Sequence, residues 1–67
     1  MVLVKLFNVE DGDYIVEFES HVVPKVNETI FIDDIEYRVE NLYHVVLTND
    51  KGREQYSHVE LEVSHIG

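Results

Sequence analysis

One segment, NETIFIDDIEYRVENLYHVVLT, constrains the fold most, because its apolar residues match across a two-residue Asp-Asp turn. With the turn at residues 33–34, Ile32 faces Ile35 and Ile30 faces Tyr37. Side chains alternate between the two faces of a strand, so these four residues lie on one face. The segment therefore predicts an antiparallel hairpin with one buried face.

The strand after this turn is unusually long. Its alternating pattern runs through residues 35–48, about 14 residues against a usual five or six. In a small domain a strand this long has to bend and serve two parts of a barrel. We expect the bend or bulge at Asn41, because an unpartnered amide on the buried face is costly. The inward residues that we predict for this strand are Val39, Tyr43, Val45 and Leu47.

The rest of the chain predicts three more strands, and no segment has helical spacing over three turns. Gly12 and Gly52 mark turns, Pro24 lies in a longer connection, and Asn27 suits a left-handed position. The predicted strands are 2–9, 14–20, 28–33, 35–48 and 55–65. The inward side chains outside the long strand are Tyr14, Val16, Phe18, Val59, Leu61 and Val63.

The turn around Gly52 predicts the register of the last hairpin. A three-residue loop with a glycine bulge is typical of this sequence. The inward pairs are then Leu47–Gln55, Val45–Ser57 and Tyr43–Val59, and the outward pairs are Val46–Tyr56, His44–His58 and Leu42–Glu60.

With 67 residues the chain is long enough for one domain, residues 1–67, with a small core. We predict an all-β fold, a small five-stranded antiparallel SH3-like barrel without substantial helix. The OB-fold is the alternative, but it usually needs a longer chain. The sequence contains no cysteine, which excludes disulfides and thiolate chemistry.

The stretch VPKVNETIFIDDIEYRVENLYHVV resembles a pattern of small SH3-like barrel proteins of bacteria and phages, mostly of unknown function. The resemblance covers residues 22–46. It rests on Val23, Pro24, Val26, Glu28, Ile30, Ile32, Tyr37, Val39 and His44. Asn27 replaces a glycine that is usual in the pattern. The resemblance implies the fold and does not imply an activity.

The charge is strongly acidic: 14 Asp and Glu oppose 5 Lys and Arg, a net charge of −9. Direct nucleic-acid binding depends on Lys and Arg contacts to phosphates, and anionic membranes attract basic segments, so this charge argues against both. The charge favours a protein partner, and a basic surface on that partner would be attracted to the acidic chain. Solubility alone is the alternative explanation. The first residues lack a signal-peptide pattern, and no apolar run reaches membrane-spanning length, so we expect a cytoplasmic protein.

No motif for catalysis or cofactor binding is present, and we expect no enzyme. The serines and threonines lack a nucleophile elbow. Ser57 adjoins His58, but neighbours on a strand point to opposite faces. The outward glutamate pairs fit a solvated surface. The glycines stand alone, which excludes a phosphate-binding loop.

The outer faces of the last three strands are the predicted binding surface for a protein partner. The anchors are Phe31, His44, Val46, Tyr56 and His58. The acidic rim is Glu17, Glu19, Glu36, Glu40, Glu60 and Glu62. Alternatives remain: the first strand covers Phe31, a second copy of the chain completes the core as a homodimer, or His44 and His58 form an ordinary surface pair.

Two narrower functions use the same residues. A phage-type acidic inhibitor would present the rim carboxylates to a basic nucleic-acid groove of its target. A small-ligand or metal-binding barrel would use His44, His58 and Glu60, because imidazole and carboxylate groups suit a divalent metal such as zinc.

Overall fold

The computed structural model describes residues 1–49, 51–52 and 54–66; the side chains of Glu54 and Tyr56 lie outside this description. These residues form five strands and no helix, in agreement with the predicted all-β class. No described helix is long and apolar enough to cross a membrane. The strands are β1 (Val2–Asn8), β2 (Tyr14–Ser20), β3 (Thr29–Ile32), β4 (Ile35–Thr48) and β5 (Glu54–His65).

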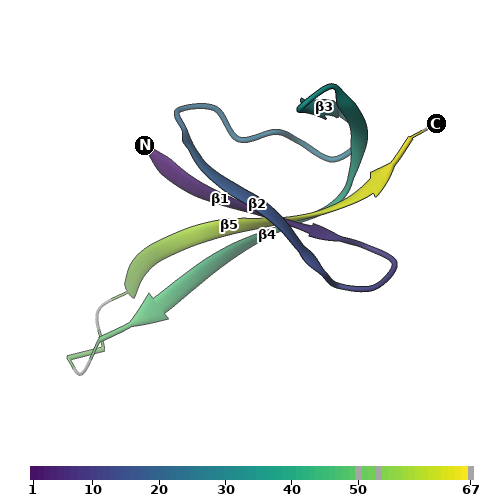
Figure 1. Ribbon diagram of the computed structural model, residues 1–67. Helices are drawn as coiled ribbons and strands as arrows, with labels where there is room; N and C mark the ends of the chain where they lie inside the picture. The colour runs from purple at the N-terminus through teal and green to yellow at the C-terminus, as the bar shows by residue number, and fades with distance from the viewer. Residues whose placement is uncertain (50, 53, 67) are drawn as a thin grey trace.

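The strands form one sheet in the order β2-β1-β5-β4-β3, which curls into an open half-barrel (Figure 1). Neighbouring strands are antiparallel except β1 and β5, which run parallel, with Val4 beside Val59 and Leu6 beside Leu61. The prediction of a fully antiparallel sheet is therefore wrong for the β1–β5 pair. Tight turns determine the direction of strands that follow each other in sequence, but they do not determine how the first and last strands meet.

The core lies on the inner face of this curled sheet. Its six fully buried side chains are all aliphatic and come from the three central strands: Val4, Leu6, Val39, Val59, Leu61 and Val63. Partly buried residues from the edge strands, such as Phe18 and Ile30, pack against them. Burying branched side chains on a pleated surface is the main source of stability in such a sheet. The predicted core residues of β5 are confirmed.

The turns have the conformations that the sequence predicts. Asp33 and Asp34 have φ angles of 49° and 68°, as both central residues of a type I′ turn require. Gly12, Gly52 and Asn27 also adopt positive φ angles of 76°, 73° and 76°. The register of the β3–β4 hairpin is consequently the predicted one.

β4 bends at a bulge between Val39 and Asn41, where Glu40 is the extra residue. The predicted bend lies one residue away, and the Asn41 side chain is exposed rather than on the buried face where unbroken alternation would place it. One extra residue exchanges the two faces of the strand. Leu42 therefore packs against the core, and Tyr43, predicted inward, is 49% exposed.

A second bulge changes the register of the β4–β5 hairpin. Leu47 pairs with Gln55 and Val46 with Tyr56 as predicted, but the Glu40 bulge has exchanged their faces. Leu47 was predicted inward and Val46 outward, whereas the register places Leu47 on the outer face and Val46 on the inner face. Ser57 is then skipped. The predicted pairs Val45–Ser57, His44–His58, Tyr43–Val59 and Leu42–Glu60 are wrong, and the observed ones are Val45–His58, His44–Val59, Tyr43–Glu60 and Leu42–Leu61. A hairpin turn determines the register only as far as the first bulge.

A third irregularity lies at the start of β2. Phe7 pairs with Tyr14 and Leu6 with Val16, which leaves Ile15 as the extra residue. Tyr14 was predicted to point inward, but it is 55% exposed. Its ring contacts Phe7 edge-on, with centroids 6.0 Å apart and an interplanar angle of 73°. The bulge thus moves one aromatic ring from the inner to the outer face.

β4 and β5 continue past the end of the β1 pairing as a two-stranded hairpin, visible at the lower left of Figure 1. β1 pairs with β5 only over residues 59–63, so residues 45–48 and 54–58 pair only with each other. We call these residues the arm and the remaining sheet the body. The arm contributes to an elongated molecule of 47 × 25 × 18 Å.

Candidate functional site

The six glutamates of the predicted acidic rim lie on one face of the sheet, the face opposite the core. The register places Glu17 and Glu60 on either side of Lys5. Two basic residues of the described strands, Lys5 and Arg38, also lie on this face. We call the six residues the outer acidic face: Glu17, Glu19, Glu36, Glu40, Glu60 and Glu62. Its negative charge exceeds that of its own cations.

Glu62 is held in place by two neighbours on β4. One of its carboxylate oxygens, Oε1, accepts hydrogen bonds from Asn41 Nδ2 and from Tyr43 Oη, both at 2.9 Å. The bond to Glu62 and the charge of its carboxylate raise the pKa of the Tyr43 hydroxyl. Both donors point outward because of the Glu40 bulge, so the bulge also organises this part of the outer acidic face.

Glu40 is anchored at the bulge itself. Its Oε1 accepts a hydrogen bond from Ser64 Oγ at 2.8 Å and from Arg38 Nε at 3.1 Å. These bonds, the Ser64 bond first, lower the pKa of the Glu40 carboxyl. The carboxylate therefore stays ionised to lower pH than an ordinary glutamate.

A hydrogen-bonded row links Ser57, His58 and Glu60 at the root of the arm. Ser57 Oγ lies 2.8 Å from His58 Nδ1, and His58 Nε2 lies 2.8 Å from Glu60 Oε2. We expected the first two side chains to point to opposite faces, and this expectation is wrong. The bulge at Ser57 departs from regular alternation and brings the neighbouring side chains together.

This row has the connectivity of a nucleophile, a base and an acid, but among the described residues its neighbours do not supply the surroundings that acyl transfer needs. Catalysis also requires donors for the developing oxyanion and a pocket for the substrate. Ser57 is exposed on the arm, and the pocket found in the structure is lined by β2, β3 and their connection. The row is better explained as a clamp that fixes Glu60 on the outer acidic face.

The predicted anchors do not form a single patch. Phe31 is 67% exposed on the outer face of β3, so the first strand does not cover it. It pairs with Glu36, ten positions along β4 from Val46, or roughly 30 Å at the usual rise per residue. His44 is exposed and pairs with Val59.

The other three anchors, Val46, Tyr56 and His58, belong to the arm. Val46 is 48% exposed, and the Tyr56 side chain lies outside the described residues. His58 pairs with Val45 and belongs to the same outer row as Glu60.

The candidate metal ligands do not converge either. His44 pairs with the residue after His58, so the register places the two imidazoles on opposite faces of the hairpin. His58 is bonded to Glu60, while His44 is separated from both by the sheet. The described residues contain no group of three or more His, Cys, Asp or Glu side chains arranged to hold a metal ion.

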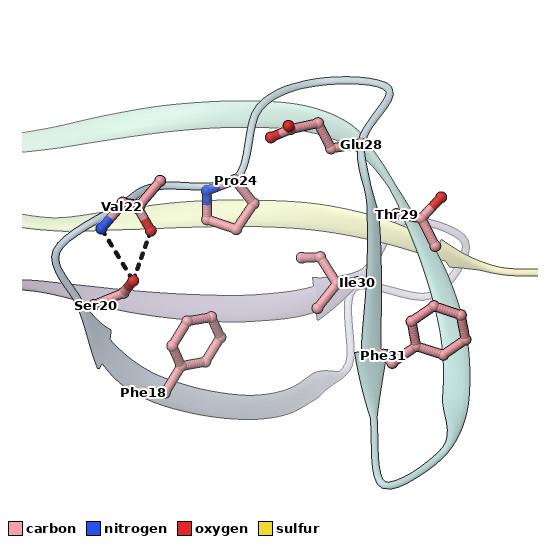
Figure 2. Close-up of a pocket in the computed structure, with 8 residues that line it drawn as sticks. All are labelled: Phe18, Ser20, Val22, Pro24, Glu28, Thr29, Ile30 and Phe31. Atoms are coloured by element: carbon pink, nitrogen blue, oxygen red, sulfur yellow. Dashed lines mark hydrogen bonds between the residues drawn. The ribbon is translucent and has the colours of Figure 1, made fainter.

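Besides the row of Ser57, His58 and Glu60, two further features of the surface were missed by sequence reasoning. One is the outward position of Tyr43, which only the Glu40 bulge reveals. The other is a pocket with a cavity volume of about 550 Å³, formed by β2, β3 and the connection between them. Figure 2 shows Phe18 and Ile30 pointing into this space, while Phe31 points away from it. Pro24 in the connection was the available signal, because it keeps that segment away from strand pairing.

Comparison with protein-family models, with curated proteins and with solved structures found no match. The inference of function therefore depends on the surface of this chain.

Proposed function

We propose that this chain is a non-enzymatic interaction module of the cytoplasm, an SH3-like barrel whose outer acidic face binds a basic surface of a protein partner. The observation that supports it most is the placement of all six rim glutamates on the outer face of one curled sheet. Four of them are hydrogen-bonded to neighbouring side chains: Glu17, Glu40, Glu60 and Glu62.

The physical basis is electrostatic complementarity. A face of one sign attracts an oppositely charged partner over roughly a Debye length, about 8 Å at physiological salt, and raises the association rate. Carboxylates that are already fixed lose less side-chain entropy on binding. Exposed aromatic rings at the same face, Phe31 and Tyr43, supply apolar contact area of the kind that dominates interface energetics.

A second candidate is an acidic inhibitor that occupies the nucleic-acid groove of a basic target. The repeated carboxylates Glu17, Glu19 and Glu60, Glu62 support it, because they form two outward pairs at a two-residue spacing on β2 and β5. Such an array resembles a row of backbone phosphates in charge. The two candidates differ only in the partner, a nucleic-acid-handling protein or another basic protein.

The test compares capture by the wild type with capture by two variants of equal charge. Glu60→Gln/Glu62→Gln removes two charges from the outer acidic face and keeps its hydrogen-bond acceptors. Asp33→Asn/Asp34→Asn removes two charges from a turn where asparagine tolerates the positive φ. Proteins captured from a lysate of the source organism would be eluted with rising salt and identified by mass spectrometry.

We expect a partner that the wild type and the turn variant retain and that the outer-face variant releases at lower salt. A nucleic-acid-handling protein in this fraction would favour the inhibitor. Equal release from both variants would show that net charge alone attracts the partner. Retention through high salt by all three proteins would overturn the electrostatic proposal in favour of apolar binding.

A further inference from the structure

The half-barrel leaves one edge of β2 unpaired. β2 lies at the end of the sheet, and within the described residues it pairs only with β1. In an antiparallel ladder alternate residues direct their N–H and C=O groups away from the partner, so this edge presents a row of free backbone donors and acceptors. β3, at the other end of the sheet, does not close the gap, and neither strand contains a masked residue.

A pocket lined by both apolar and polar residues, the apolar ones in the majority, adjoins this free edge. The pocket of about 550 Å³ lies between β2, β3 and the connection, a volume within the usual range of ligand sites. Phe18 of β2 and Ile30 of β3 point into it, and Pro24 of the connection forms its upper wall in Figure 2. The inward side chains of a strand added to β2 would enter this space.

The other face of β2 has the opposite chemistry. Glu17 and Glu19 are exposed there and alternate with the inward residues Val16 and Phe18. Directly opposed charges of opposite sign stabilise neighbouring strands, and like charges destabilise them. An added strand would therefore fit best with apolar residues inward and lysine or arginine outward.

Glu17 and Glu19 also disfavour the binding of a second copy of the chain at the edge of β2. Two β2 strands paired with each other would bring their acidic residues together, and each chain has a net charge of −9. Charged residues on an edge strand are a common defence against self-pairing. The charges of Glu17 and Glu19 thus disfavour pairing of two β2 strands with each other and favour pairing of β2 with a basic segment.

We propose that the free edge of β2 binds an extended segment of a partner protein in which apolar and basic residues alternate, by strand addition. Main-chain hydrogen bonds supply part of the affinity, and the pocket and the glutamates select the sequence. This site shares Glu17 and Glu19 with the outer acidic face, but it binds an extended segment through the backbone of β2 rather than the surface of a folded partner.

The test uses a fluorescein-labelled, end-capped peptide, KVKVKVK, in anisotropy titrations against the full chain. EVEVEVE is the charge control. Two further peptides have N-methyl groups on every valine or on every lysine. In a strand, alternate residues direct their N–H groups to opposite edges, so one methylated peptide retains the donors that face β2 and the other loses them.

We expect KVKVKVK and one methylated peptide to bind, at least tenfold more tightly than EVEVEVE and the second methylated peptide. Amide resonances of residues 14–20 would shift on binding. Equal binding of both methylated peptides would overturn strand addition, because charge attraction alone does not distinguish them. The absence of binding up to millimolar peptide would also overturn it.

Matched variants then locate the site. We expect Glu17→Gln/Glu19→Gln to weaken KVKVKVK binding by about three- to tenfold, as the loss of two cross-strand pairs implies. Asp33→Asn/Asp34→Asn removes the same charge elsewhere and should leave the affinity within about twofold of wild type. Equal weakening in both would show a general charge effect. Dimerisation of the Glu17→Gln/Glu19→Gln variant by light scattering would support the role of these charges in preventing self-pairing.

Discussion

The body of the sheet and its arm both carry aliphatic residues on their strands but bury them to very different extents. In the body, Val59, Leu61 and Val63 are fully buried along β5. In the arm, Val46 and Leu47 of the paired strand β4 are 48% and 59% exposed. The two regions share one hairpin and one ladder of backbone pairing.

The difference lies in what adjoins the hairpin. Over residues 59–63 β5 has β1 on its other side, and partly buried residues of the edge strands pack against the inner face. Beyond that point two strands are alone, and an isolated two-stranded hairpin is marginally stable in water. Alternation therefore shows which side chains share a face, whereas burial depends on a third strand.

The largest expected effect tests this contrast directly. Leu61→Ala removes a fully buried side chain and should cost about 2–5 kcal/mol of unfolding free energy. That loss is similar to the whole stability of a domain this size, about 3–5 kcal/mol. Leu47→Ala in the arm should change stability by less than about 0.5 kcal/mol. Urea denaturation followed by circular dichroism measures both; equal losses would show that the arm is part of the cooperative core.

Hydrogen exchange should reveal the same division without mutation. Amides of residues 59–63 should exchange only through global unfolding, while those of 45–48 should exchange through local opening of the arm. After correction for intrinsic rates we expect the arm amides to exchange roughly ten- to hundredfold faster. Uniform protection along β4 would contradict the proposed independence of the arm.

Local features of the fold could be predicted because local chemistry determines them. Asp33 and Asp34 occupy a turn with positive φ, and the β3–β4 register follows from it. The buried positions of β5 follow from strict alternation. The outward position of Glu60 and Glu62 follows from the same alternation, so most of the outer acidic face was predictable.

The predictions that failed were those that depended on bulges or on pairing between strands far apart in the sequence. The bulges at Ile15, Glu40 and Ser57 each exchange the faces of one strand. Only the Glu40 bulge had a sequence signal, the amide of the neighbouring Asn41, and no residue type marks the other two. The Ser57 bulge shifts the register by one residue, so that His44 pairs with Val59 and the predicted His44–His58 pair does not form. The parallel meeting of β1 and β5 has no local sequence signature, and Pro24 indicates the connection beside the pocket but not the pocket itself, because both features depend on how the sheet curls.

A smaller effect on stability is expected in the body, where it depends on the ionisation of Glu40 at the bulge. Because hydrogen bonds hold the pKa of the folded Glu40 carboxyl below that of the unfolded chain, Glu40 stabilises the fold above its ordinary pKa. This stabilisation is lost as the pH falls through the lowered value. Ser64→Ala should raise the Glu40 pKa in a carboxyl-detected NMR titration. It should destabilise the protein near pH 7 more than at acidic pH, whereas Thr48→Ala in the arm should show no such dependence.

The smallest effect lies where the body meets the arm, at Tyr43. The raised pKa of its hydroxyl means that the neutral form is favoured in the fold, so its stabilising contribution is present below the ordinary tyrosine pKa. It is lost as the pH rises through the raised value. Glu62→Gln keeps the acceptor but removes the charge, and should therefore move the Tyr43 pKa back towards the ordinary one in an NMR titration of the ring. Glu19→Gln, on the distant edge strand, should leave it unchanged. An unaltered Tyr43 pKa in Glu62→Gln would mean that the bond across the β4–β5 pair does not persist in solution, and that the body ends before Tyr43.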